Sequence, residues 1–469
     1  MVASSQDPFA QDDPVDALRP RAGAGADAED DFDALGFDTS FGGETPGASS
    51  GFGLEPMAAD AGLSDQDATP PAGIYIGEEV SVLDASSIGR ALAEAEGRTL
   101  EQLPDFEVLQ QGLIGIDIGA SVGVVARFNR DGKHEVVPNQ DDDLITPGQI
   151  FFDDDGERIV GREARLMAAS APQRAVVDLK AVIADPDFKR HLGAQGEVAA
   201  VDVLAIFLQR LVSDVEAHSG ERPTHVSLAA PAWYSEAHKE LLARAVAAAG
   251  MELVGITDEA LSAAVPYSLR LPDLKERRAL VVDLGHAALG VAVVRCVQGD
   301  IQVLAKSARR ELGSSQWDRL LAQEAARKFR EIHKIDPLED ERAAVDLELR
   351  AEDAKRELSR RPHCTLVVSA GGKSLKIGFK REGFEKAARS LLEGIEQLLS
   401  EVREQAGIAD WKDLDALIMT GGGSRTPAVR RLVAQETGMR PERGISPEDV
   451  VAVGSLYWGI GERHRRRGS

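Results

Sequence analysis

Two stretches of the sequence place an aspartate and a glycine at a turn between apolar segments. LIGIDIGASVGVVARF contains Asp117 and Gly119, and ALVVDLGHAALGVAVV contains Asp283 and Gly285. Glycine permits a tight bend and close approach of a ligand to the main chain, and the N–H groups of such a turn attract phosphate oxygens. A carboxylate repels phosphate unless a divalent cation lies between them. The two turns therefore predict a polyphosphate–Mg²⁺ site, with the metal held by Asp117 and Asp283 through water.

A third glycine-rich turn occurs in LIMTGGGSRTPAVRRLV. An apolar segment runs into three glycines, and a helix is expected to start near Pro427. A strand, a glycine turn and a helix N-terminus in succession suit the phosphate or the sugar of a nucleotide. The turn therefore adds Gly421, Gly422, Gly423 and Arg425 to the candidate binding residues.

Strand-like and helix-like patterns alternate from residue 112 onward. Strands are expected at residues 113–117, 123–128, 225–230, 279–283, 291–297 and 415–420. Helices are expected at residues 235–249, 315–332, 340–360 and 384–406. The alternation predicts an α/β fold, and the repeated aspartate–glycine hairpin indicates two related lobes. SAGGKS ends like a phosphate-binding loop but lacks that motif's first glycine, so a hairpin turn is expected there.

The bulk properties of the chain exclude several classes of function. Its 469 residues are enough for two or three domains, and a net charge of −24 argues against a nucleic-acid partner. Two cysteines without CxxC spacing argue against a disulfide framework or a thiolate zinc site. The longest apolar stretch contains Asp283 and His286, so no membrane span is expected. The polar, acidic start lacks a signal segment, which predicts a cytoplasmic location.

The first part of the chain is unusually acidic. Residues 1–70 contain fifteen acidic and two basic residues. Such a segment buries too little apolar surface to offset the entropy lost on ordering. We therefore expect a disordered acidic arm over residues 1–72, whose spaced phenylalanines are either docking motifs or part of a solubilising tail. Residues 73–111 are expected to form a short ordered appendage, because IYIGEEVSVL alternates like a strand and SSIGRALAEAEG is helix-like.

From about residue 113 to residue 461, these motifs resemble, in order, the ATPase portion of the 70-kilodalton heat-shock chaperone family. LIGIDIGASVGVVA resembles its first phosphate loop, and RIVGREARLMAASAPQRAVVDLKAVI the stretch with its catalytic lysine. Another family signature resembles VSLAAPAWYSEAHKELLARAVAAAGMELVGITDEALSAAVPYSL. The adenosine-binding helix of the family resembles AEDAKRELS, and its closing helix resembles ISPEDVVAVGSLYWG. The resemblance implies an actin-like ATPase fold, with two ribonuclease-H-like lobes around a nucleotide cleft.

The resemblance also implies which residues bind ATP or ADP with Mg²⁺. Lys180 corresponds to the catalytic lysine and Glu259 to the phosphate-region glutamate; Asp117 and Asp283 complete the catalytic set. The implied nucleotide-binding residues are Gly119, Ala120, Ser121, Gly285, His286, Glu352, Lys355, Arg356, Ser359, Gly421, Gly422, Gly423, Arg425 and Glu448.

The spacing within the implied adenosine-binding helix agrees with this assignment. Glu352, Lys355, Arg356 and Ser359 follow one another at i, i+3, i+4 and i+7, so they share one helix face. They could converge on one ribose and base, with the Arg356 stem stacked on the purine. A charged surface stripe would explain the spacing equally well, but not its position between the flanking motifs.

The resemblance divides the chain into the arm, the appendage and four further parts. These are lobe I, lobe II with an adenine-binding helical subdomain, a closing helix that returns to lobe I, and a basic tail. Their expected boundaries are residues 112–278, 279–446, 447–462 and 463–469.

The second phosphate loop departs from the family pattern Asp-Leu-Gly-Gly-Gly-Thr-x-Asp. Ala288 and Gly290 stand in place of the threonine and the second aspartate, and His286 and Ala287 replace two glycines. The first loop has Ala-Ser where two threonines are usual. Each lost polar group is expected to slow hydrolysis by on the order of 10²-fold, so the sequence predicts nucleotide binding with reduced turnover.

Three functions follow from these patterns. One is a heat-shock-70-like, ATP-binding switch, chaperone-like or partner-regulating, with slow or partner-dependent hydrolysis and a protein partner or co-chaperone. Another is a non-enzymatic pseudo-ATPase scaffold that docks partners through the acidic arm. An actin-like filament former has only superfamily kinship in its favour. No built-in peptide-binding domain is expected after the closing GIGERHRRRGS.

Overall fold

The computed structural model describes most of the chain from residue 106 onward. The described residues are 75–76, 106–192, 196–231, 234–271, 275–297, 300–443 and 446–468. The expected arm over 1–72 and the helix expected from SSIGRALAEAEG lie outside them. Of the expected appendage, the structure describes strand β1 (Tyr75–Ile76) and helix α2 (Phe106–Gln110).

Lobe I is built on a mixed sheet with strand order β12-β11-β2-β3-β4, in which β5 also pairs with β3. Its strands are β2 (Leu113–Ile118), β3 (Val122–Phe128), β4 (His134–Val136), β5 (Thr146–Pro147), β11 (His225–Ala230) and β12 (Glu252–Asp258). β2 and β3 form an antiparallel hairpin, whereas β11 runs parallel to both β2 and β12. Asp117, near the end of β2, and Asp258, at the end of β12, consequently lie at the same edge of the sheet, with β11 between the two strands.

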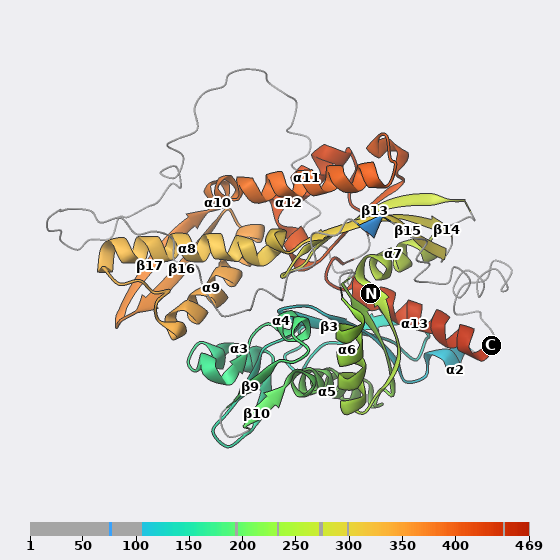
Figure 1. Ribbon diagram of the computed structural model, residues 1–469, viewed down its shortest axis with the longest axis horizontal. Helices are drawn as coiled ribbons and strands as arrows, with labels where there is room; N and C mark the ends of the chain where they lie inside the picture. The colour runs from blue at the N-terminus through green and yellow to red at the C-terminus, as the bar shows by residue number, and fades with distance from the viewer. Residues whose placement is uncertain are drawn as a thin grey trace, which may run out of the picture.

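Helices and small strands cover lobe I and extend it toward lobe II (Figure 1). Helices α5 (Ala200–Ser219) and α6 (Glu236–Ala248) bury apolar side chains in one core with the sheet. The extension contains β6 (Ile150–Phe152), β7 (Arg158–Val160), α3 (Arg162–Ala168), η4 (Pro172–Arg174), β8 (Ala175–Val176), α4 (Leu179–Ala184), β9 (Lys189–His191) and β10 (Glu197–Ala199).

Lobe II repeats the strand arrangement of lobe I. Its sheet has the order β1-β15-β14-β13-β18, with strands β13 (Arg277–Leu284), β14 (Leu289–Val297), β15 (Asp300–Arg309) and β18 (Ala416–Thr420). β13, β14 and β15 are antiparallel, and β18 runs parallel to β13 with Asp283 opposite Thr420. Asp117 and Asp283 therefore occupy corresponding positions at the ends of β2 and β13.

A helical subdomain and two covering helices complete lobe II. Its elements are η6 (Arg310–Leu312), α8 (Ser314–His333), α9 (Glu341–Arg360), β16 (His363–Ala370), β17 (Lys373–Lys380), α10 (Arg381–Ala387), α11 (Arg389–Gln405), η7 (Trp411–Asp413), η8 (Gly422–Arg425) and α12 (Pro427–Thr437). SAGGKS is the β16–β17 turn that was predicted, with Gly371 and Gly372 at positive φ. The single helix expected at 384–406 is wrong, because α10 and α11 are separate helices that meet at Ala388.

Two helices lie between the sheets and join the lobes (Figure 1). α7 (Glu259–Leu269) and α13 (Val450–Gly468) share an apolar core with strands of both lobes. The helices cross so closely at Gly454 that a Cβ atom there would overlap the carbonyl oxygen of Ser262. α13 continues to Gly468, so residues 463–468 are helical and not the separate basic tail that was expected.

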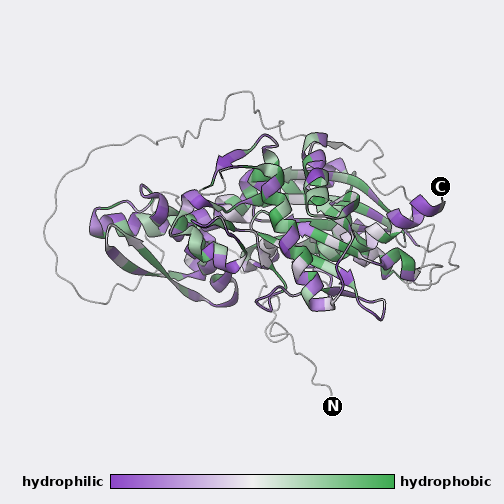
Figure 2. Ribbon diagram, turned by 90° about the horizontal axis from the view of Figure 1, so that it is seen from below, coloured by the Kyte–Doolittle hydropathy of each residue, from purple (hydrophilic) through white to green (hydrophobic). Residues whose placement is uncertain are grey.

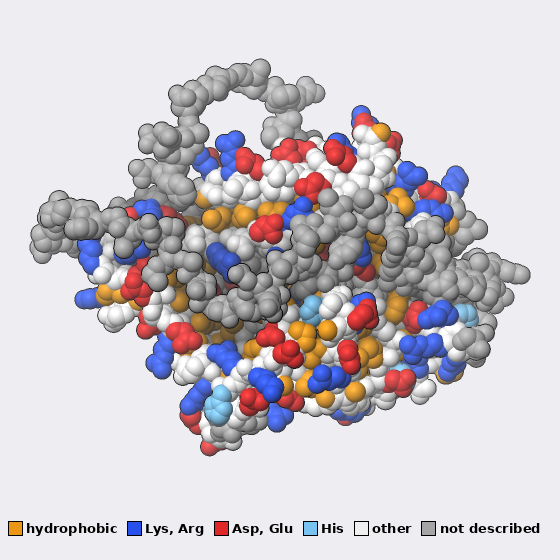
Figure 3. Space-filling view, viewed as in Figure 1, with side chains coloured by type: hydrophobic (Ala, Val, Ile, Leu, Met, Phe, Trp, Pro, Cys, Tyr) orange, Lys and Arg blue, Asp and Glu red, His pale blue; other side chains and the backbone are white. Residues whose placement is uncertain are grey.

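Apolar residues follow the sheets and the inner sides of the helices, and polar residues follow the outer helices and loops (Figure 2). Acidic and basic side chains are intermixed over the face shown in Figure 3. Among the helices that the structure describes, none is apolar over a length that would cross a bilayer.

Candidate functional site

Four of the predicted residues gather where the two sheet edges face each other. Asp258 ends β12 and caps α7 by accepting hydrogen bonds from Ala260 N and Leu261 N. This cap places Glu259 at the first position of α7, where its Oε1 accepts a 2.8 Å hydrogen bond from Lys180 Nζ. The charges of Lys180 and Glu259 act on both Asp117 and Asp283. The structure thus brings the two turn aspartates and this ion pair into one cluster.

The cluster carries an excess of buried acid. Burial raises the pKa of Asp117 to about 7, and the negative Glu259 adds to the rise while Lys180 opposes it. Burial and Glu259 likewise hold the pKa of Asp283 well above its usual range, again against Lys180. For Lys180, burial alone would lower the pKa, but the surrounding negative groups raise it, so the ammonium stays charged. One lysine faces three carboxyl groups.

A hydrated Mg²⁺ fits this excess. Asp117 Oδ1 is buried and has no hydrogen-bond partner among the described residues, and such an oxygen is costly to bury unless a cation or a donor meets it. Within the described part of the chain, no three His, Cys, Asp or Glu side chains gather closely enough to enclose a metal by themselves. Mg²⁺ characteristically keeps several water ligands and binds through one or two carboxylates and phosphate.

The first turn is fixed to the helix that carries Lys180. A Cβ atom at Gly119 would lie 2.6 Å from Val122 O, so only glycine fits without displacement. Ala120 O accepts a 3.0 Å hydrogen bond from Leu179 N at the start of α4, and Ser121 O accepts one of 2.8 Å from Gly148 N. The position of Lys180 is therefore coupled to the backbone of the turn.

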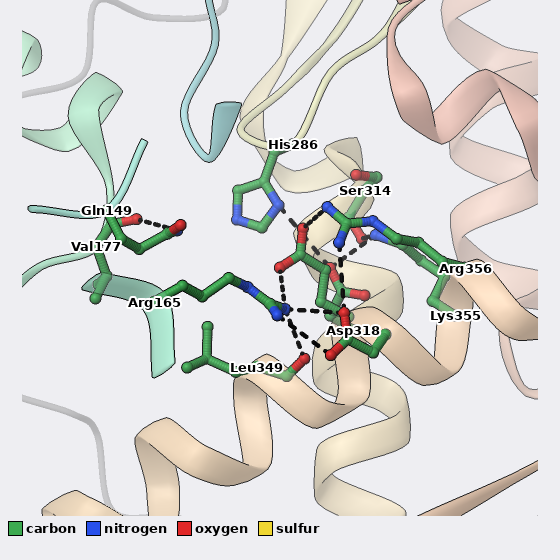
Figure 4. A network of polar contacts seen from close by, with 11 residues as sticks. Gln149, Arg165, Val177, His286, Ser314, Asp318, Leu349, Lys355 and Arg356 are labelled. Carbon is green, nitrogen blue, oxygen red and sulfur yellow. Dashed lines mark hydrogen bonds and ion pairs between the residues drawn. The ribbon is translucent and has the colours of Figure 1, made fainter. Parts of the chain in front are cut away.

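The second turn is fixed to the start of α8. Ser314 N donates to Gly285 O over 2.9 Å, and Ser315 N donates to His286 O over 3.0 Å. His286 directs its ring toward the helical subdomain, where its Nδ1 lies 3.9 Å from Asp318 Oδ2 (Figure 4). Burial lowers the pKa of His286, so the ring is neutral at pH 7. The sequence identified a side chain in place of a glycine here, but not the direction in which it points.

The third glycine turn packs directly on the end of β13. A Cβ atom at Gly421, whose φ is +77°, would lie 2.5 Å from the carbonyl carbon of Leu284 and 2.6 Å from Asp283 Oδ1. Gly422 faces open space, with nothing within 4 Å of the position of a Cβ atom. Arg425, at the end of this turn, forms an ion pair with Glu448 just before α13. The turn therefore lies against the same carboxylate cluster.

The predicted adenosine-binding face of α9 is present, but its polar groups already have partners. Lys355 Nζ donates to Ser314 O over 3.0 Å and to Asp318 Oδ2 over 2.7 Å. Arg356 pairs with Glu352 over 2.6 Å, and Ser359 Oγ donates to Lys355 O within the helix. Ribose and base would have to compete with, or add to, these contacts.

A cavity of about 340 Å³ opens beside this helix. It is lined by Asp353, Arg356, Glu357, Arg360 and Arg361. The cavity adjoins the adenosine side of the predicted site and not the carboxylate cluster. The half-exposed Arg356 side chain thus borders both the cavity and the Glu352 carboxylate.

Comparison with known proteins agrees with this geometry. A family model described as "Hsp70 protein" matches residues 113–194 and 185–459. The chain belongs to the Hsp70 family. Its fold is accordingly the actin-like ATPase fold of that family, as the sequence motifs predicted. Similar curated proteins named "Chaperone protein DnaK" occur in Thermotoga petrophila, Thermotoga maritima and Thermotoga neapolitana, each 30% identical over 350 residues. The match covers 73% of this chain and 58% of each relative.

One departure from the Hsp70 loop pattern lies beside Asp283. Gly290 is directly opposite Asp283 in the β13–β14 ladder. A Cβ atom at Gly290 would approach nothing more closely than the Asp283 Cβ at 3.9 Å. The backbone at residue 290 therefore leaves room for the Cβ atom of an aspartate, although the glycine provides no carboxylate.

Sequence reasoning missed two participants in the site. Asp318, on α8, is buried between Lys355 and His286, and burial raises its pKa to about 6. Arg165, on α3 of lobe I, reaches lobe II and donates to Glu352 Oε2 over 3.0 Å and to Asp353 Oδ1 over 3.0 Å (Figure 4). Arg165 lies in the same quoted stretch as Lys180, which was the one signal available for it.

The raised pKa of Asp117 predicts an unusual pH dependence for this Hsp70-family chain. From the ordinary value of 3.8 up to about 7, the native state binds more protons than the unfolded state, so stability falls as pH rises through this interval. In Mg²⁺-free buffer we expect the thermal midpoint of wild type to fall between about pH 5 and about pH 7, and less so in Asp117→Asn. Added Mg²⁺ should recover more stability at the higher pH, because it binds the ionised form. A wild-type midpoint that rises with pH would contradict the assignment.

Proposed function

We propose that this chain binds ATP or ADP with Mg²⁺ between its lobes and acts as a chaperone-type nucleotide switch with slow or partner-dependent hydrolysis. The observation that carries the proposal is the cluster of Asp117, Asp283, Glu259 and Lys180 at the junction of three glycine turns. The chain spans little more than half the length of its DnaK relatives, so their full activity is not carried over. A cytoplasmic location and a protein partner or co-chaperone belong to the same proposal.

In this mechanism the main chain and Lys180 supply the fixed positive groups. Backbone N–H groups of the Gly119, Gly285 and Gly421 turns bind phosphate oxygens. Lys180, held by Glu259 and charged at pH 7, stabilises negative charge on the transferring phosphoryl group. Mg²⁺, when bound, would neutralise phosphate charge next to Asp117 and Asp283. The groups are positioned before reaction and need little reorganisation.

Slow turnover follows from what the second turn lacks. Ala288 and Gly290 provide neither a hydroxyl nor a carboxylate to orient an attacking water, although Lys180 and Glu259 remain. The neutral ring of His286 points toward Asp318 and does not replace these groups. Binding and hydrolysis are therefore separable in this protein.

The bridge from Arg165 to α9 provides a means for the lobes to respond to nucleotide. It joins α3 of lobe I to α9 of lobe II and includes a 2.9 Å hydrogen bond to Leu349 O. A ligand that binds the closed arrangement more tightly than the open one shifts the population toward closure. A partner that recognises one arrangement would then report the nucleotide state.

We predict that Arg165→Ala accelerates nucleotide release about tenfold, because it removes charge-assisted hydrogen bonds worth about 1.5 kcal/mol. Stopped-flow displacement of a fluorescent ADP measures this rate. The matched control is Arg350→Ala, which removes an ion pair with Asp346 that stays within α9. Equal release rates in the two variants would show that the inter-lobe bridge does not hold the nucleotide.

The decisive experiment is calorimetric titration of the full chain with ATP and ADP, with and without Mg²⁺. We expect saturable, Mg²⁺-dependent binding that weakens at least about tenfold in Asp283→Asn, which loses a metal-side carboxylate. Exposed Asp131→Asn provides a control for the loss of one negative charge. Absence of binding to wild type at millimolar nucleotide would overturn the proposal.

A pseudo-ATPase scaffold is the second candidate. It is favoured by Ala288 and Gly290 and by α9 groups that already pair with one another. It predicts that Asp117→Ala leaves cellular function intact, whereas removal of residues 1–72 abolishes it. The nucleotide switch predicts that Asp117→Ala impairs function.

A further inference from the structure

The second phosphate turn carries a ring that the Hsp70 loop pattern lacks. His286 stands where that pattern has a glycine, in the turn between β13 and β14. Ser315 N donates to His286 O over 3.0 Å, and a Cβ atom at Gly313 would lie 2.6 Å from the same oxygen. The backbone that carries the ring is therefore held closely against the start of α8.

The ring projects from this turn toward the helices that are expected to bind adenosine. Its Nδ1 lies 3.9 Å from Asp318 Oδ2, and its other nitrogen, Nε2, is directed away from Asp318 (Figure 4). Among the charged groups that act on the ring, Glu352 on α9 has the largest effect. The side chain is 28% exposed, so a ligand can reach it. The ring thus lies between the phosphate turn and the predicted adenosine-binding face.

Asp318 determines which nitrogen of this neutral ring carries the proton. Burial raises the pKa of Asp318 to about 6, so its carboxylate is ionised at pH 7. Lys355 donates to Oδ2, whereas Oδ1 is buried and has no hydrogen-bond partner among the described residues. A carboxylate that faces Nδ1 favours the tautomer protonated on that nitrogen. Nε2 is then an acceptor and not a donor.

The acid on the predicted adenosine-binding face is already engaged. Glu352 Oε2 accepts a hydrogen bond from Arg165 over 3.0 Å, and its Oε1 accepts one from Arg356 over 2.6 Å. A sugar hydroxyl needs an acceptor for its proton, and at Glu352 it would compete with these two charge-assisted bonds. Within the described part of the chain, the His286 ring makes no hydrogen bond. Its Nε2 therefore provides an acceptor without such competition.

We propose that Nε2 of His286 accepts a hydrogen bond from a ribose hydroxyl of the bound nucleotide, and that this contact makes the site selective for ribonucleotides over deoxynucleotides. The inference rests on the proposed function, because it names the side chain through which the same site recognises the sugar. It belongs to this chain and not to the Hsp70 loop pattern, whose glycine offers no side chain at this position.

The tautomer is tested without nucleotide, by nuclear magnetic resonance of the full chain labelled with ¹⁵N-histidine. The signals of His286 are identified by their absence from His286→Phe. We expect Nδ1 to be protonated and Nε2 to show the shift of an unprotonated nitrogen, with a change toward the opposite tautomer in Asp318→Asn. A wild-type ring protonated on Nε2 would overturn the proposal whether or not the chain binds nucleotide, because that nitrogen would donate and could not accept.

Selectivity is tested by calorimetric titration of the full chain with ADP, 2′-deoxy-ADP and 3′-deoxy-ADP. The proteins are wild type, His286→Phe, which keeps a planar ring without an acceptor, and His286→Gln, whose amide oxygen can accept in place of Nε2. We expect His286→Phe to weaken ADP binding about fivefold, a typical effect of one hydrogen bond. Its affinity for the analogue that lacks the contacted hydroxyl should equal that of wild type. His286→Gln should keep most of the preference for ADP.

Two results would overturn the sugar contact. Unchanged ADP affinity in His286→Phe would show that the ring does not bind the nucleotide. Equal weakening of all three nucleotides would show that it acts on phosphate or on the fold of the turn. In both cases wild type still binds ADP and the proposed function stands. If wild type binds none of the three nucleotides, the proposed function itself fails, and the sugar contact fails with it.

Discussion

Ala288→Thr combined with Gly290→Asp should raise the rate of ATP hydrolysis at least about 10²-fold, because a single preorganised polar group in an active site commonly contributes that much. The variant returns a hydroxyl and a carboxylate to two of the loop positions where this chain departs from the Hsp70 pattern. The backbone has room for the larger residue at 290, where a Cβ atom would meet nothing closer than Asp283 Cβ at 3.9 Å. Lys180 and Glu259 already provide the charged groups beside it.

Single-turnover hydrolysis of ATP by the full chain in saturating Mg²⁺ measures this gain. The matched control is Ala288→Val/Gly290→Asn, which reproduces the shapes of the new side chains without a hydroxyl or a carboxylate. If both variants remain as slow as wild type while still binding ATP, the two departures do not limit turnover. The pseudo-ATPase scaffold would then be the better description.

The arrangement of the phosphate turns was predictable because its signals are local. Each aspartate lies near the end of a buried strand, two residues before a glycine. Within lobe II, the parallel pairing of β13 and β18 brings the second and third turns to the same edge of the sheet. β2 and β13 end one residue beyond the expected positions, and the third turn follows β18 and precedes a helix that begins at Pro427. A short local pattern therefore specified the position of each turn.

The contacts between the lobes were not predictable from such patterns. Arg165 meets Glu352 across 187 positions, and Lys306 meets Asp258 across 48. Nothing near either basic residue distinguishes it from a solvated surface charge. These pairings depend on how the two lobes are arranged in space. The local periodicity of a sequence does not reveal that arrangement.

The prediction of a single helix over residues 384–406 failed for a related reason. Residues 384–406 keep a helical pattern through Ala388, and neither proline nor glycine occurs at the break. Phe384 packs on Trp317 with ring centroids 5.7 Å apart, and a Cβ atom at Gly394 would lie 2.6 Å from Leu312 Cδ2. Each helix is thus aligned by a separate tertiary contact, which the helical periodicity does not reveal.

Gly454→Ala should destabilise the protein by about 3 kcal/mol, at the upper end of the usual cost of overpacking, because a Cβ atom there would lie 1.7 Å from a backbone oxygen. The new methyl would overlap the Ser262 carbonyl oxygen and lie 2.5 Å from the carbonyl carbon, and neither backbone atom is free to rotate away. α7 and α13 must then separate, and with them the core that joins the lobes. Helix propensity opposes this result, since alanine in a helix interior is favoured over glycine by about 1 kcal/mol.

The sign of the change therefore distinguishes the two effects, and urea unfolding of the full chain measures it. Gly459→Ala, in the same helix, is the matched control, because its Cβ atom would meet only side-chain atoms, Ser227 Cβ at 3.0 Å and Leu113 Cδ2 at 3.3 Å. A small loss, under about 1.5 kcal/mol, is expected there. If Gly454→Ala unfolds at the same urea concentration as wild type, the helices do not cross as closely as described. The placement of Glu259 on α7 beside Asp117 and Asp283 would then lose its structural support.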